Sequence, residues 1–168
     1  MKRCLVAITK KNFQNSISTK KIDVKVNLST ELEGLTVAQK KDLKQIVGDT
    51  IVDEVRESSR KKTSSVTGRA FPKLSKEYRA IKRSAGGVGQ PNLRLTGNML
   101  DSLGSNTNRA NGVSVTIPEH QAGKSFNHIK GDTLPKRQFL PDKGQAFKKE
   151  IMKAINQKVR DFKKTLKK

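Results

Sequence analysis

The chain has 168 residues, and its 36 Lys and Arg against 15 Asp and Glu give a formal net charge of +21. A hydrophobic share of 33% with no Trp indicates a modest core, so burial against partners is expected to supply part of the stability. The charge favours polyanions or acidic protein surfaces as partners, but it does not separate a nucleic-acid-binding protein from a basic structural subunit.

The first 35 residues are expected to form a region of strands or an ordered arm. The only cysteine, Cys4, cannot form an internal disulfide, and its apolar run ending at Ile8 is too short for a signal peptide or a membrane span. Residues 22–28 alternate apolar and polar side chains, which predicts a half-buried strand, and residues 29–34 predict a turn. A single domain over residues 36–168 is expected to follow.

A long helix is predicted from Thr36, which can act as its N-cap, to about Arg60. Its apolar stripe consists of Leu43, Ile46, Val47, Thr50, Ile51 and Val55. Glu54 falls within that stripe and Val52 points the other way. We interpret this as the last turn leaving the core, with a helix contacted on two sides as the alternative.

Residues 61–69 are basic, rich in Ser and Thr and without periodicity, so they predict an exposed loop. A short helix is expected next, capped by Ser75 and with Tyr78 and Ile81 on one face. The stretch "AGGVGQP" should end it, because three Gly and a Pro do not continue a helix.

The stretch "PNLRLTGNMLDSL", residues 91–103, predicts a strand, a tight turn and a short helix. Leu93 and Leu95 alternate like one face of a strand, Thr96 offers an N-cap oxygen, and a helical face follows. Residues 104–112 are polar and predict a turn. The stretch "VSVTIP" then predicts a strand, residues 113–118.

Residues 119–143 are interpreted as irregular, and a second long helix is expected from Asp142 or Lys143 nearly to the end. Its apolar stripe consists of Phe147, Ile151, Ala154, Ile155, Val159, Phe162 and Leu166. The candidate polyanion-binding side chains on its opposite face are Lys149, Lys153, Arg160, Lys164 and Lys167. Together the elements predict an α+β fold, with a small antiparallel sheet packed against two long helices and several short ones.

Each candidate enzyme motif lacks a residue or a structural context that its chemistry requires, so we expect no catalytic activity and no cofactor. "PEHQAGKS" ends like a phosphate-binding loop, but Pro118 stands where the motif needs a glycine N–H, and the βαβ context is missing. "AGGVG" lacks the strand that a dinucleotide-binding turn requires. His120, His128 and the distant Cys4 make a poor metal set, and no nucleophile has a base at a recognisable spacing.

Five segments in order resemble the phage virion-morphogenesis and tail-completion proteins of the virion neck. They are "FPKLSKEYRAIKR", "PNLRLTGNMLDSL", "VSVTIP", "HQAG" and "LPKRQFL", followed by a closing helix. The resemblance covers roughly residues 71–146, and the order of the segments is more specific than any one of them. It implies a non-enzymatic structural protein, a tail-completion, tail-terminator or head-tail connector subunit that forms a ring oligomer, hexameric or dodecameric, and contacts other neck, connector and tail-tube proteins.

The resemblance also assigns scaffold roles to matching positions. The strand-turn-helix hub would comprise Leu95, Thr96, Gly97, Met99, Leu100 and Leu103. A corner would be formed by His120, Gln121 and Gly123, and the segment that sets the last helix would contain Pro135, Arg137, Phe139 and Leu140. The protein would then be a virion component, assembled in the host cytoplasm.

The contacts to neighbouring subunits are expected from irregular charged loops, which can order on a partner surface. The candidate interface residues are Lys61, Lys62, Arg69, Lys124, Lys130 and Lys136. The alternative function is a basic protein that binds nucleic acid without sequence preference through the cationic face of the last helix.

Overall fold

We analysed a computed structural model of the chain, which describes residues 8–93 and 98–166. Its centre is a four-stranded antiparallel sheet with strand order β1-β2-β4-β3. The strands are β1 (Phe13–Ile17), β2 (Ile22–Asn27), β3 (Gly104–Asn106) and β4 (Gly112–Ile117). The predicted α+β class, with a small antiparallel sheet and two long helices, is confirmed.

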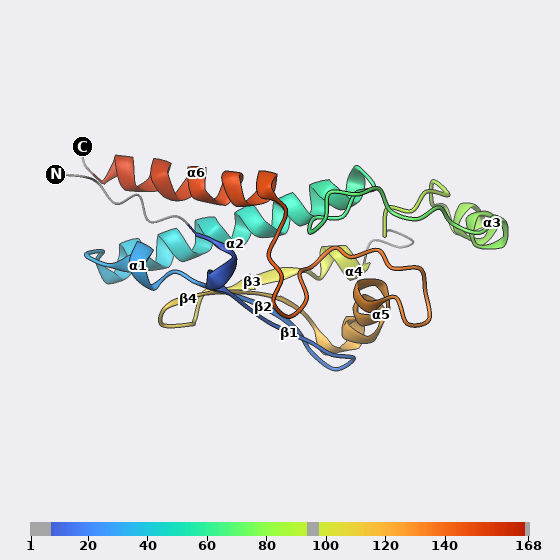
Figure 1. Cartoon of the computed structure of the whole chain (residues 1–168), viewed down its shortest axis with the longest axis horizontal. Helices are drawn as coiled ribbons and strands as arrows, with labels where there is room; N and C mark the ends of the chain where they lie inside the picture. The colour runs from blue at the N-terminus through green and yellow to red at the C-terminus, as the bar shows by residue number, and fades with distance from the viewer. Residues whose placement is uncertain (1–7, 94–97, 167–168) are drawn as a thin grey trace.

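The two long helices lie on the same side of this sheet, with the first against its strands and the second against the first (Figure 1). Helix α2 (Val37–Arg60) begins at Thr36, whose hydroxyl accepts from the backbone N–H of Gln39, as predicted. It contacts β3 and β4 on one side and α6 (Lys149–Thr165) on the other. Figure 1 shows α6 and α2 running side by side above the sheet. The helix is therefore contacted on two sides, which the sequence offered only as the alternative, and Val52 is buried.

The shorter helices lie around this body. They are η1 (Lys10–Asn12), α1 (Ser29–Leu32), α3 (Lys76–Ser84), α4 (Asn98–Asp101) and α5 (Glu119–Lys130). Helix α3 starts at the predicted cap, where the Ser75 hydroxyl accepts from the N–H of Tyr78 at 3.2 Å. Figure 1 shows α3 at one end of the long axis, beyond the sheet and the ends of α2 and α6. We call residues 72–92 the arm.

The strand predicted at the start of residues 91–103 is wrong at Leu93. This residue has a positive φ of 59°, a left-handed conformation that no strand residue adopts, and residues 91–93 belong to no strand. Leu95, Thr96 and Gly97 lie outside the described residues. Besides β2, the strand that pairs with β4 is β3, a short polar segment within the predicted turn of residues 104–112.

The irregular stretch predicted over residues 119–143 is also wrong, because α5 occupies its first half. His120, Gln121 and Gly123 are consequently helical residues and not a corner. The second long helix starts at Lys149, later than predicted. Residues 142–148 are held in a loop, because the Asn15 amide donates to two of their carbonyls, those of Asp142 at 2.8 Å and Gln145 at 3.1 Å.

The loop at residues 61–69 is less exposed than predicted. The Ser64 and Ser65 side chains are buried, and their hydroxyls donate to the carbonyls of Gln138 and Phe139. The Lys148 N–H donates to the Ser65 carbonyl at 2.8 Å. This loop therefore fastens the end of α2 to the segment before α6.

The core contains residues from both predicted regions of the chain, the first 35 residues and residues 36–168. Val24 and Val26 of β2 and Val113 and Val115 of β4 are fully or almost fully buried at the centre of the sheet. Residues 22–27 pair with residues 112–117 along their whole length. The sheet is thus built from the N-terminal 35 residues together with the middle of the chain.

Candidate functional site

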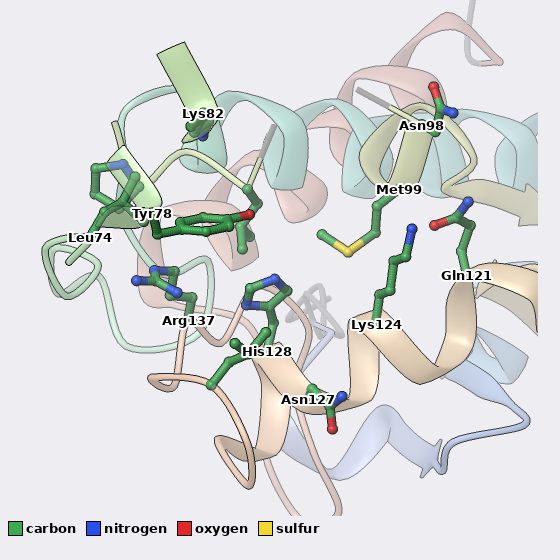
Figure 2. A pocket seen from close by; sticks show the side chains of 13 residues that line it. Leu74, Tyr78, Lys82, Asn98, Met99, Gln121, Lys124, Asn127, His128 and Arg137 are labelled. Carbon is green, nitrogen blue, oxygen red and sulfur yellow. The ribbon is translucent and has the colours of Figure 1, made fainter. Parts of the chain in front are cut away.

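A pocket of about 320 Å³ lies between the arm, helix α5 and residues 134–137. Its volume falls in the range of small-ligand sites, roughly 300–1,000 Å³. The residues that line it are Leu74, Tyr78, Lys82, Pro91, Leu93, Asn98, Met99, Gln121, Lys124, Asn127, His128, Leu134 and Arg137. Figure 2 shows the Tyr78 ring above the side chains of Arg137 and His128, with Met99 and Lys124 across the pocket.

Lys82 reaches the pocket from α3, although only 3% of the residue is exposed. Its Nζ donates to the Gln90 carbonyl and to the Asn92 Oδ1, both at 2.6 Å. These bonds hold the loop after α3 against the helix. Burial, and secondarily the charge of Arg137, lower the pKa of the Lys82 ammonium below its ordinary value.

Arg137 is 5% exposed and comes from the segment that follows α5. Gly131 caps α5 with a φ of 84°, and the chain turns back so that the Arg137 N–H donates to the His128 carbonyl at 2.8 Å. The guanidinium donates from Nη2 to the Pro72 carbonyl at 3.3 Å, while its buried Nε has no hydrogen-bond partner among the described residues. Burial lowers the pKa of Arg137, and Tyr78 opposes that shift.

His128 faces the same space from α5. Burial, followed by the positive charges of Arg137 and Lys82, lowers the pKa of His128 to about 4. The imidazole is therefore neutral near neutral pH. Its Nδ1 is buried and has no hydrogen-bond partner in the described part of the chain.

The pocket thus combines unbalanced positive charge with apolar walls. Lys124 adds a third cationic side chain at the mouth, and Gln121 and Asn127 add amides. None of the described residues that line it is Asp or Glu, whereas an isolated buried charge normally has a partner. An anionic group is the ligand that this arrangement attracts.

The structure gathers part of the predicted scaffold and one predicted interface residue at this pocket. Met99, Gln121 and Arg137 of the scaffold and Lys124 of the interface set line it. Leu100, Leu103, Phe139 and Leu140 are buried in the core. His120 and Pro135 are exposed and Gly123 is half-buried.

The other predicted interface residues do not converge on one site. Lys61 is exposed and pairs with Glu57 at 3.3 Å, while Lys130 pairs with Asp142. Lys62 is half-buried with a positive φ, and Arg69 and Lys136 are exposed. On α6 the side chains of Lys149, Lys153, Arg160 and Lys164 are all exposed, and Lys167 lies outside the described residues.

Sequence reasoning missed several lining residues, namely Leu74, Tyr78, Lys82, Asn127, His128 and Leu134. A signal for two of them exists, because Tyr78 and Lys82 are spaced four residues apart on one face of the predicted short helix, and Leu74 stands directly before its cap, Ser75. The α5 residues could not be grouped once that segment was interpreted as irregular.

The fold is that of a small α+β protein with a cationic pocket. No family model matches the chain, and no significant match was found among curated proteins or solved structures. In residues 8–93 and 98–166, no group of three or more His, Cys, Asp or Glu is placed to hold a metal ion. No helix over the same ranges has the length and apolarity needed to cross a bilayer.

Proposed function

We propose that the protein is a structural subunit of a phage neck or tail, a tail-completion or head-tail joining component that acts by assembling into a ring. The resemblance of residues 71–146 to such proteins is the sequence support. The structural support is the arm, which lies at one end of the molecule (Figure 1). Several of its apolar side chains are exposed.

Large exposed apolar side chains concentrate at this end. Of the six in the described part of the chain, four belong to the arm or to the pocket beside it: Tyr78, Ile81, Val88 and Leu134. Ile81 and Val88 are 56% and 64% exposed. Exposed apolar surface rimmed by polar residues is typical of protein interfaces. A ring would bury Ile81 and Val88, which do not line the pocket, against the next subunit and repeat the contact around its axis.

The decisive experiment is mass spectrometry of purified virions produced from the genome that encodes the chain. We expect its peptides in a small number of copies per particle, and imaging of the neck should place a ring there. A chain expressed during infection but missing from washed virions would refute the proposal.

Assembly of the purified protein gives a second, independent prediction. We expect a ring-sized oligomer by mass photometry at micromolar concentration, and we expect Ile81→Asp with Val88→Asp to shift it toward the monomer, because each change places a charge in the buried contact. Val37→Asp is the matched control, since Val37 is 86% exposed at the start of α2, outside the arm. A monomer before and after substitution would argue against a ring built through the arm.

The second candidate, sequence-independent nucleic-acid binding, is favoured by one observation. Lys149, Lys153, Arg160 and Lys164 are exposed along α6, where their charges are available to phosphates. Two of the four have polar neighbours on the helix: Arg160 donates to Gln157 at 2.7 Å and Lys164 lies 3.4 Å from Asp161. The salt dependence of the affinity for duplex DNA tests this candidate.

A further inference from the structure

We propose that the pocket between the arm and α5 binds the carboxylate of an Asp or Glu side chain presented by an acidic partner protein. The inference rests on the proposed function for the source of that side chain, an adjoining protein of the neck. Its chemistry rests on the pocket alone.

The donors for a carboxylate are already in place. The buried Nε of Arg137 has no partner among the described residues, and guanidinium N–H groups match carboxylate oxygens in geometry. The Lys82 ammonium has three N–H groups, of which two are used by Gln90 and Asn92. Lys124, on α5, points into the opening opposite the Tyr78 ring (Figure 2). Three cations therefore line the space that an acid would enter, and none of the described lining residues is a competing carboxylate.

The depth of the cations favours a flexible side chain over a nucleic-acid phosphate. Lys82 and Arg137 are at most 5% exposed, so a phosphate on the wide cylinder of a duplex could not approach them closely. An Asp or Glu side chain reaches inward on a narrow methylene stem. The walls formed by Leu74, Met99 and Leu134 would contact that stem and its neighbours.

Charge also identifies the partner as a different protein. The chain has a formal net charge of +21 and only 15 acidic residues, so a second copy would bring few carboxylates and mostly like charge to this cationic pocket. A predominantly acidic protein gains from that same field during approach. We therefore assign the pocket to a contact between unlike proteins, separate from contacts around the ring.

The test is a titration followed by the methyl signals of methionine. Met99 lines the pocket and Met152 lies on α6 outside it, so the protein carries both a reporter and an internal reference. The probes are the blocked tripeptide acetyl-Leu-Glu-Leu-amide and its matched control acetyl-Leu-Gln-Leu-amide. We expect the Glu peptide to shift Met99 saturably and to leave Met152 unchanged, and the Gln peptide to bind at least roughly tenfold more weakly, because it lacks the charge.

Two variants connect the shift to the cations. Lys124 is exposed, so Lys124→Gln should leave the fold intact while weakening the binding of the Glu peptide roughly two- to fivefold. Lys20→Gln, an exposed lysine outside the pocket, is its control and should have no such effect. Arg137→Gln should weaken the binding of the Glu peptide by at least about 30-fold, provided that the spectrum of the variant shows a folded protein.

The pKa of His128 provides a second readout, because it would not change if the cations of the pocket served only to stabilise the fold. Tyr78 and Lys82 face it from α3, Lys124 from its own helix, and Arg137 from the following segment. A bound carboxylate offsets these cations, so the pKa of His128 should rise from about 4 when the Glu peptide is added. The Gln peptide should leave it unchanged.

Three results would overturn the inference. Equal binding of the two peptides would make the pocket a plain apolar groove. Saturation of the Met99 shift by inorganic phosphate or by a short DNA duplex at a lower concentration than the Glu peptide would show that the pocket binds another anion. An unmoved Met99 would mean that no carboxylate enters. None of these results bears on whether the chain is present in virions, so the proposed function is tested separately.

Discussion

At the scale of single residues, the surroundings of His128 give the fold a calculable pH dependence. The ordinary pKa is 6.5 and the folded value is about 4, so the unfolded chain binds this proton first as the pH falls. The contribution of neutral His128 to stability is complete above about pH 6.5 and is lost toward pH 4. It amounts to on the order of 3 kcal/mol at most.

Urea unfolding at several pH values measures this effect. His128→Gln should flatten the fall in the free energy of unfolding between about pH 7 and about pH 5. His120→Gln, which removes an exposed histidine of the same helix, should keep the fall of the unsubstituted protein. If both variants match the unsubstituted protein, His128 is not held neutral by its surroundings.

The ion pair between Lys163 and Glu31 makes a second residue-scale prediction. Glu31 is 4% exposed in its side chain, whereas Lys163 is 38% exposed. Lys163→Met leaves a buried carboxylate without its cation and should cost about 1–3 kcal/mol. Glu31→Gln leaves an ammonium that water can reach, so it should cost less, about 1 kcal/mol or below. Chemical denaturation of both variants checks the order of the two costs, and the reverse order would contradict the assigned asymmetry.

At the scale of elements, α2 approaches the sheet closely at Gly48. A Cβ built there would lie 2.5 Å from the Ser105 Cβ and 3.0 Å from a Val113 methyl group. Gly48→Ala should therefore destabilise by about 1–3 kcal/mol, although alanine is the better helix former by about 1 kcal/mol.

A double-mutant cycle tests this packing contact. Adding Ser105→Gly to Gly48→Ala removes the nearest obstructing atoms, so part of the lost stability should return. Asp53→Ala, an exposed substitution in the same helix, should stay within about 0.5 kcal/mol of the unsubstituted protein. Purely additive costs would show that α2 and β3 do not meet at Gly48.

Elements with their own local signal were predictable, and elements made by tertiary contacts were not. The starts of α2 and α3 could be assigned because Thr36 and Ser75 are caps whose hydroxyls bond three residues ahead. Helix α5 was missed because its buried face consists largely of small or polar side chains, such as Ala122 and Ser125. Strand β3 has no apolar pattern and exists because β4 offers its edge.

The candidate pocket was predictable only in part for a related reason. The resemblance points to Met99, Gln121 and Arg137, but as scaffold. The burial of Lys82 is not expected from the sequence, because lysine is almost never buried without a partner. Its partners, Gln90 and the Asn92 side chain, lie beyond a glycine-rich break that gives no sign of turning back to the helix.

At the scale of the whole molecule, the question is whether the positive charge acts as a general field or through a dedicated surface. A chain of +21 will attract DNA at low salt whatever its function. Sequence-independent binding through one surface would instead depend on the cations of that surface, each of which releases counterions on contact. The two cases differ in where a charge reversal has its effect.

Two triple variants with the same loss of charge separate these cases. One carries Lys149→Glu, Lys153→Glu and Arg160→Glu on α6, and the other reverses the exposed Lys10, Lys11 and Lys20 near the first strand. For a structural subunit, duplex affinity and its slope against salt concentration should fall by similar amounts in both, because only the total field has changed. For a nucleic-acid-binding protein, the α6 variant alone should lose roughly two to three units of that slope. Fluorescence anisotropy of a short duplex across a salt series measures the slopes, and a loss confined to the α6 variant would favour the nucleic-acid function over the neck assembly proposed here.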